Sequence, residues 1–122
     1  MTLTLFSFGH KHGPPVGADL VFDARLLPNP YWVEELKEHR GTEPRVAAYV
    51  LDNDLGREFL DRLLPFLRFC ILAAQQANRE ALTVAIGCTG GRHRSVAVVE
   101  ELGRQLADLA PCTITHRDIG RE

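Results

Sequence analysis

The chain has 122 residues, of which 45% are apolar, and carries a formal net charge of −2 with a pI near 6.2. This length supports one domain with one core, and the odd, widely spaced cysteines indicate reduced thiols rather than a disulfide framework. The slightly acidic balance excludes bulk attraction to nucleic acid, and no segment has the pattern of a secretory signal or a bilayer-spanning run. We therefore expect a single cytoplasmic domain over residues 1–122, with no membrane partner.

The first third of the chain predicts two short strands and a short helix. Residues 3–8 favour a β-strand, and residues 18–23 favour a second one after a loop rich in glycine and proline. Prolines at positions 28 and 30 forbid a regular ladder beyond the second strand. Residues 32–38 predict a short charged helix.

The middle of the chain predicts two further helices. Residues 45–50 indicate a weak helix, which runs into an Asp-Asn-Asp turn. Leucine, isoleucine and alanine then recur at helical spacing over residues 60–74, which predicts a helix facing the core. Pro65 lies inside this pattern, so the helix either kinks there or begins afresh with proline in its first turn.

The last third predicts strand, helix and strand. Residues 82–86 are continuously apolar, as is typical of a parallel strand covered on both faces. An apolar stripe over residues 96–109 predicts the next helix, which Pro111 ends, and residues 112–116 form a last strand. The alternation predicts an α/β fold with a small, mostly parallel sheet and flanking helices.

Residues 87–95 (GCTGGRHRS) join the third strand to the helix after it. Such a glycine turn points successive backbone N–H groups and the positive end of a helix dipole at one spot. Arg94 and Ser95 lie at the start of the same helix, and ligands of open α/β sheets bind beyond the carboxyl ends of the strands. The segment therefore predicts a binding site for a phosphate-like anion.

The same segment satisfies C-x-x-x-x-x-R-S, the spacing of the phosphate cradle in cysteine-dependent phosphatases. In that alternative the Cys88 thiolate attacks phosphorus, Arg94 binds two phosphate oxygens and the Ser95 hydroxyl relieves the leaving thiolate. However, Gly87 stands where phosphatases usually have histidine, and no acid loop resembling Trp-Pro-Asp is visible. We therefore favour binding without catalysis, with Cys88 as a small buried residue under the loop.

Two other groups invite a functional or a structural reading. Asp23 and Arg25 close the second strand, so they either meet a sugar amine and its phosphate or brace the proline turn as an ion pair. Lys11 and His12 lie on the first loop, which either covers the same pocket or is simply solvated. His10 and His12 form an H-x-H pair without a third ligand at a recognisable spacing, so we predict no metal site.

Four stretches carry a more specific signal. They are SFGHKHG at 7–13, ADLVFDARLLPNPYW at 18–32, TVAIGCTGGRHRS at 83–95 and THRD at 115–118. In the same order, and spread along the whole chain, they resemble the carboxyl-terminal domain of the RapZ family.

The resemblance implies a bacterial adaptor domain, with a fold akin to a phosphofructokinase subdomain. It implies binding of glucosamine-6-phosphate and small regulatory RNA, or contact with a regulatory protein, together with self-association, and neither enzymatic activity nor a cofactor. It places the phosphosugar pocket at the loop and at the Asn-Pro pair. The ligand residues so implied are Asn29, Tyr31, Thr89, Gly90, Gly91, His93 and Arg94.

Two features depart from the family pattern. Full-length members carry an amino-terminal kinase-like domain with a G-x-x-x-x-G-K-[ST] loop, which does not occur here, and Met1 directly before the first strand favours an isolated module. Members that bind RNA end in a basic tail, whereas Arg117 and Arg121 here alternate with acidic residues, which removes counterion release from RNA affinity. With Arg92 and His116, these two arginines remain the candidate RNA contacts.

Overall fold

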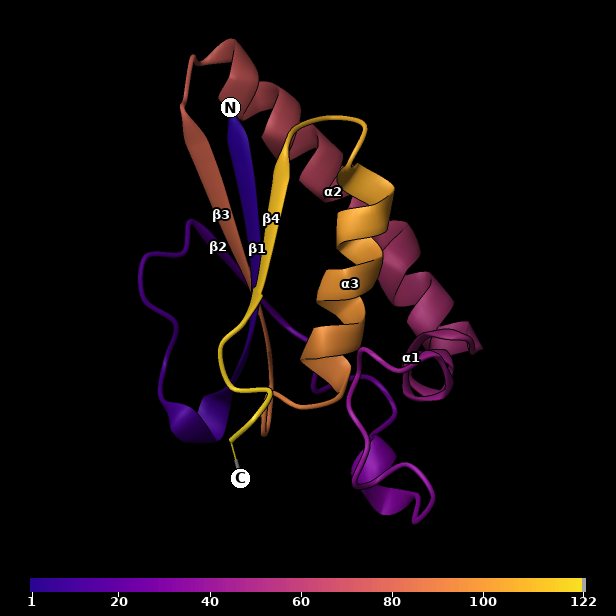
Figure 1. Ribbon diagram of the computed structural model, residues 1–122. Helices are drawn as coiled ribbons and strands as arrows, with labels where there is room; N and C mark the ends of the chain where they lie inside the picture. The colour runs from indigo at the N-terminus through magenta and orange to yellow at the C-terminus, as the bar shows by residue number, and fades with distance from the viewer. Residues whose placement is uncertain (122) are drawn as a thin grey trace.

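Four parallel strands form one sheet in the computed structural model, which describes residues 1–121 (Figure 1). In spatial order the strands are β2 (Leu20–Asp23), β3 (Ala81–Cys88), β1 (Thr2–Gly9) and β4 (Cys112–His116). Central β1 pairs with β3 and β4, so that Leu5 lies between Val84 and Ile114. Because every pair is parallel, the carboxyl ends of the strands meet at one edge, at the bottom of Figure 1. The predicted α/β class with a small parallel sheet is confirmed.

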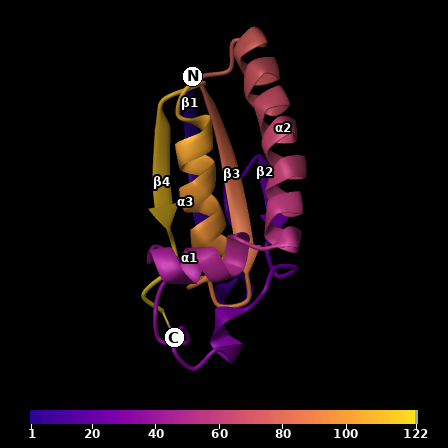
Figure 2. The same cartoon turned by 90° about the vertical axis from the view of Figure 1, so that its right-hand side faces the viewer.

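The α-helices of the described residues gather on one side of this sheet (Figure 2). They are α1 (Pro44–Leu51), α2 (Asp54–Gln76) and α3 (Arg94–Leu106). Helix α3 packs on β1, β3 and β4, whereas α2 packs on β3 and α1 crosses near the start of α3. The core between these layers is mainly apolar, with side chains such as Leu5, Val84 and Leu102 completely buried. Its burial supplies the main driving force for folding.

No helix covers the opposite face within the described residues, because the β1–β2 connection contains only the 3-10 turn η1 (His10–His12). Phe8 and Ala85 are nevertheless fully buried. The Phe8 ring lies 4.9 Å from the His10 ring and 5.5 Å from the Arg117 guanidinium. The apolar run of β3 is therefore buried as expected, but loop side chains supply the cover on this face.

Helix α2 resolves the alternative that the sequence left open at Pro65. It runs as one α-helix through that proline, and the Asn53 side chain caps its start by accepting from the Gly56 N–H at 2.8 Å. The missing N–H of Pro65 leaves the carbonyl of Asp61 without its helical donor, but Asp61 is exposed and water replaces the bond at little cost.

The prediction of a helix over residues 32–38 is wrong. The structure has the 3-10 turn η2 (Pro30–Trp32) followed by separate turns, with Leu36 as the only buried residue of the segment. A single buried side chain gives no apolar stripe to hold a helix against the core. Leu109 likewise lies beyond the end of α3, in a turn, rather than in its buried stripe.

Candidate functional site

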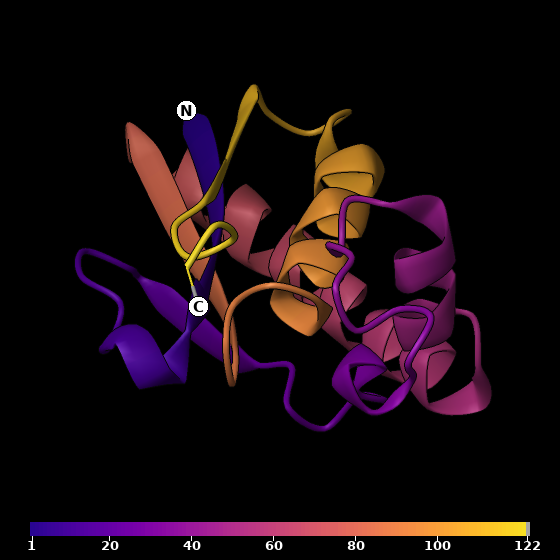
Figure 3. The same ribbon diagram turned by 60° about the horizontal axis from the view of Figure 1, so that its bottom comes forward.

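A cavity of about 640 Å³ opens at the carboxyl edge of the sheet, beside the loop between β3 and α3. Figure 3 brings this edge forward, with the loop, the η1 and η2 turns and the turn after β4 around it. Most of the ligand residues expected from the resemblance line the cavity. They are Asn29, Tyr31, Thr89, Gly90, His93 and Arg94.

Close backbone packing fixes the loop. Gly91 has a φ of +78°, and a Cβ there would lie 2.6 Å from the Gly9 nitrogen. A Cβ on Gly9 would lie 2.3 Å from the carbonyl carbon of Gly90, so neither position tolerates a side chain without movement. A Cβ on Gly90, by contrast, would enter open space, with Lys11 Cε at 4.0 Å as its nearest neighbour. Gly91 is therefore needed for the conformation of the loop, whereas the absence of a side chain at Gly90 leaves the outer surface of the loop accessible.

The backbone N–H groups of residues 90–96 donate no hydrogen bond to any acceptor among residues 1–121. The last of them belong to the first turn of α3, whose amides have no intrahelical partners. The 13-residue helix adds the positive end of its dipole at the same place. A row of free donors at a helix start suits the oxygens of a phosphate.

Arg94 is 6% exposed and braces the site. Its Nη1 donates to the carbonyl oxygen of Arg25 at 2.9 Å, and its Nη2 donates to Thr89 Oγ1 at 3.3 Å. The guanidinium has five N–H groups, so these bonds leave donors for a ligand in the cavity that it lines. Arg94 therefore holds the turn after β2 and adds a positive charge to the loop.

His93 connects the loop to the segment after η2. Burial lowers the pKa of its imidazole below the ordinary value, although the carbonyls of Lys37 and His39 act in the opposite direction. The ring is consequently neutral at pH 7, and its Nε2–H donates to the Lys37 carbonyl oxygen at 3.0 Å. Cavity-lining His93 is thus a positioning residue for this wall.

The rest of the cavity wall is strongly cationic. Lys11, Lys37, Arg92 and Arg121 join Arg94, and Glu38 is the one carboxylate among the lining residues that the structure describes. Arginine and lysine side chains that line one cavity create a field that attracts anions. The arrangement is suited to a phosphate ester.

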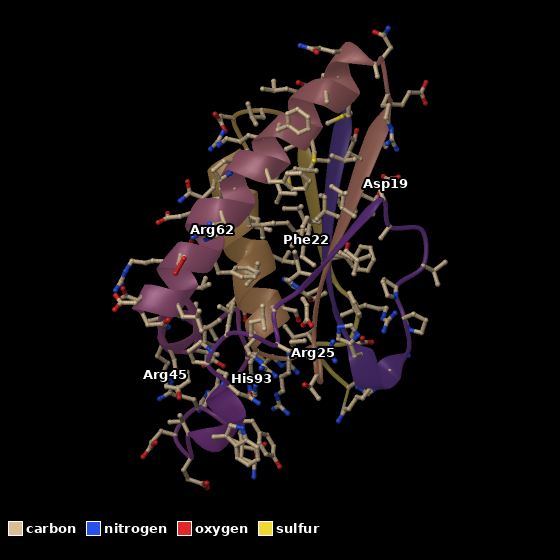
Figure 4. The ribbon with its side chains drawn as sticks, turned by 180° about the vertical axis from the view of Figure 1, so that it is seen from behind. Asp19, Phe22, Arg25, Arg45, Arg62 and His93 are labelled. Carbon is tan, nitrogen blue, oxygen red and sulfur yellow. The ribbon has the colours of Figure 1, made fainter. Side chains whose placement is uncertain are left out.

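Four of the expected ligand residues lie outside the lining of the cavity. Asp23 and Arg25 form a bidentate pair with each other, the Arg25 Nε lying 2.9 Å from Asp23 Oδ1, and this pair lowers the pKa of the Asp23 carboxyl. Figure 4 shows Arg25 at the same end of the molecule as His93. Gly91 and Ser95 support the loop from beneath, with Ser95 Oγ 3.0 Å from Cys88 Sγ.

The candidate RNA contacts divide into two pairs. Arg92 and Arg121 line the cavity. His116 lies between Ser7 Oγ at 2.7 Å and Glu100 Oε2 at 2.9 Å, and Arg117 donates to Asp118 and to the carbonyls of Gly13 and Pro14. The first pair also bonds within the fold, Arg92 to the Glu38 carbonyl and Arg121 to Asp118, but unlike the second pair it lines the cavity.

Sequence reasoning missed four residues of this region. Trp32, Lys37 and Glu38 line the cavity, but the expected helix over residues 32–38 hid them. Asp118 is fully buried and accepts the Gly9 N–H at 2.7 Å. Its place in the quoted THRD stretch was the available signal. No group of three possible metal ligands occurs within residues 1–121, and none of the helices described there is both long and apolar enough to cross a bilayer.

Comparison with known proteins gives a consistent result. The family described as RapZ C-terminal domain matches residues 1–120. A nucleotide-binding protein of Frankia alni is 48% identical over 100% of this chain and 43% of its own length, and one of Corynebacterium aurimucosum is 48% identical over 98% and 42%. One of Brevibacillus brevis is 43% identical over 98% and 41%. The chain spans about two fifths of the length of these curated bacterial relatives.

Proposed function

Because the chain belongs to the RapZ C-terminal domain family, we propose that it senses a phosphorylated amino sugar such as glucosamine-6-phosphate as a non-catalytic regulatory domain in the cytoplasm. The phosphate binds free amides of the loop residues that line the cavity, Gly90, Arg92 and His93, together with Arg94. The sugar ring extends into the cavity toward Asn29 and Tyr31.

One observation carries the proposal: among the residues with unpartnered amides, Gly90, Arg92, His93 and Arg94 line a cavity with five cationic side chains. A phosphate there gains several charge-assisted hydrogen bonds without displacing any intramolecular one. The Asn29 side chain accepts the backbone N–H of Tyr31 at 3.1 Å, which fixes the start of the turn from which both residues line the cavity.

Cysteine-dependent phosphatase activity is the competing function. In its favour, Cys88 Sγ lies 3.0 Å from Ser95 Oγ and lines the cavity. Against it, Cys88 is 3% exposed and Arg94 donates to backbone carbonyls. Of the carboxylates described, Glu38 alone lines the cavity as a candidate general acid. Binding without turnover fits this arrangement better.

Small RNA is the macromolecular partner that we propose, with self-association of the domain. Arg92 and Arg121 support this role because they join the cationic cavity wall. If they neutralise phosphates, RNA affinity falls steeply with salt, and Arg121→Gln reduces the slope by about one. A salt slope that Arg121→Gln leaves unchanged would argue against an RNA contact at this residue.

Calorimetric titration with glucosamine-6-phosphate tests the proposed function. We expect Arg94→Ala to weaken binding roughly ten- to a hundredfold, the effect of one charge-assisted contact of about 1.5–3 kcal/mol. Arg25→Gln is the matched control, because Arg25 lies outside the cavity lining and pairs with Asp23. Equal binding by the wild type and Arg94→Ala would refute the site. Hydrolysis of an aryl phosphate that disappears in Cys88→Ser would establish the phosphatase instead.

A further inference from the structure

Trp32 is the single tryptophan of the chain and lines the wall of the cavity. It is 78% exposed, more than any other aromatic side chain described. Indole contributes more contact area than most side chains when it is covered. Its exposure on the wall of a binding cavity therefore provides a large apolar surface next to the phosphate-binding amides.

The backbone and a neighbouring ring hold this indole in place. The backbone N–H of Trp32 donates to the Asn29 carbonyl oxygen at 3.2 Å within the η2 turn. The Tyr31 and Trp32 rings meet edge to face, with centroids 5.0 Å apart and an interplanar angle of 85°. Lys37 Nζ lies 4.7 Å from the centroid of Tyr31. Tyr31 is half exposed beside these neighbours, whereas Trp32 is more exposed still.

Three hydrogen bonds join the segment carrying Trp32 to the phosphate loop. Arg92 Nη2 donates to the Glu38 carbonyl oxygen at 2.7 Å, and the Gly41 N–H donates to the Arg92 carbonyl oxygen at 2.9 Å. His93 adds its bond to the Lys37 carbonyl. Although residues 33–41 form only turns, these bonds tie the backbone that follows Trp32 to the loop that carries the free amides. A ligand that contacts both Trp32 and the free amides therefore binds two segments that are already joined.

We propose that Trp32 stacks on the ring of the bound phosphate ester, so that the site selects phosphate esters that carry a ring over acyclic ones. The inference rests on the proposed function, because the phosphate must occupy the amides for the ring to reach Trp32. The shared chemistry is a ring face that an indole can cover. A pyranose presents C–H groups to indole, and a nucleobase presents its π face.

Four probes and two variants test this selection by calorimetry. Inorganic phosphate reports on the amides alone, glycerol 3-phosphate is the acyclic ester, and glucose 6-phosphate and uridine 5′-monophosphate offer a sugar ring and a base. We expect the wild type to bind a ring ester about tenfold more tightly than glycerol 3-phosphate. Trp32→Ala should abolish that preference and leave the affinity for inorganic phosphate unchanged, and Trp32→Phe should retain most of the preference.

Intrinsic fluorescence gives a second readout, because Trp32 is the only tryptophan. A ring ester should change its emission, whereas inorganic phosphate should not. If no probe binds, the proposed function fails. If phosphate binds but ring esters show no preference, or Trp32→Ala weakens all probes equally, the stacking role alone is overturned. A Trp32→Ala variant that keeps the preference and changes only the oligomeric mass would assign Trp32 to an interface between copies and overturn it as well.

Discussion

The loop between β3 and α3 and the turn after β4 meet at the same edge of the sheet, but they use their polar groups in opposite ways. The first leaves the amides of residues 90–96 without partners among the described residues. In the second, the charged side chains pair with one another. Asp118 accepts the Gly9 N–H and pairs with Arg117 at 2.8 Å and Arg121 at 3.3 Å. Two neighbouring loops of similar composition therefore have different tasks.

This contrast shows that arginines near a cavity cannot be assigned a role from charge alone. Arg117 spends its donors on Asp118 and on the carbonyls of Gly13 and Pro14, which ties the β1–β2 loop to the end of the chain. Arg94 also donates to a backbone carbonyl, but it lines the cavity and keeps N–H donors there. Stability and ligand affinity should consequently respond to different substitutions.

Replacing Asp118 should have the largest effect, and the effect should be on stability. Asp118 is fully buried, pairs with the partly exposed Arg117 and accepts the Gly9 N–H, so Asp118→Asn weakens both interactions and should cost about 3 kcal/mol. Urea denaturation measures the loss. The affinity of the folded protein for glucosamine-6-phosphate should change less than threefold. A large loss of affinity with normal stability would show that the two loops are not separate.

The adjacent glycines offer the sharpest internal comparison. Gly91→Ala should reduce the free energy of unfolding by about 2 kcal/mol, because Gly91 has a positive φ and its methyl group would meet the Gly9 nitrogen. Gly90→Ala should fold normally but bind phosphate more weakly, since its methyl group enters the open space in front of the amides. Thermal denaturation of both variants measures the effect on the conformation of the loop, and phosphate titration measures the effect on access of the ligand to the amides. Equal effects of both substitutions would contradict the assignment.

Acid pH should destabilise the protein through His93. Its pKa is lowered in the folded state, so below the ordinary value of 6.5 the unfolded chain binds a proton that the folded chain does not. The contribution to stability is present above pH 6.5 and is lost as the pH falls through the folded pKa. The free energy of unfolding between pH 7.5 and 5 should therefore fall less in His93→Gln than in the wild type. Parallel pH profiles would place the titration elsewhere.

The smallest expected effect concerns Glu38, whose side chain is 77% exposed. Glu38→Gln removes the single carboxylate among the described lining residues, and should tighten phosphate binding by at most about threefold at low salt. This increase in affinity should vanish at about 0.5 M salt, because an exposed charge is screened there. Weaker binding in the variant would mean that Glu38 contacts the ligand directly.

Much of the fold and part of the site followed from the sequence. The apolar runs of β1 and β3 and the apolar stripe of α3 are long and regular, so the sequence predicted these elements. The glycines of residues 87–95 predicted the turn, because glycine permits the backbone conformations that a tight turn needs. The segment of residues 32–38 was misassigned because charged residues are compatible with both a helix and a run of turns. Only tertiary bonds, such as that from His93 to the Lys37 carbonyl, decide between them.

The partners of the arginines were equally beyond reach. Arg94 and Arg117 have the same side chain and similar neighbours in sequence, but one bonds carbonyls 67 and 69 residues away and the other bonds those 103 and 104 residues away. Such long-range contacts depend on strand order, which local patterns do not determine.

Titration of ¹⁵N-labelled protein with glucosamine-6-phosphate, followed by the amide resonances, tests the central claim most directly. The resonances of residues 90–96 should shift progressively with ligand, while those of Arg117 and Asp118 stay in place. Absence of any shift in residues 90–96, or the main shifts at Arg117 and Asp118, would contradict an anion site at the start of α3.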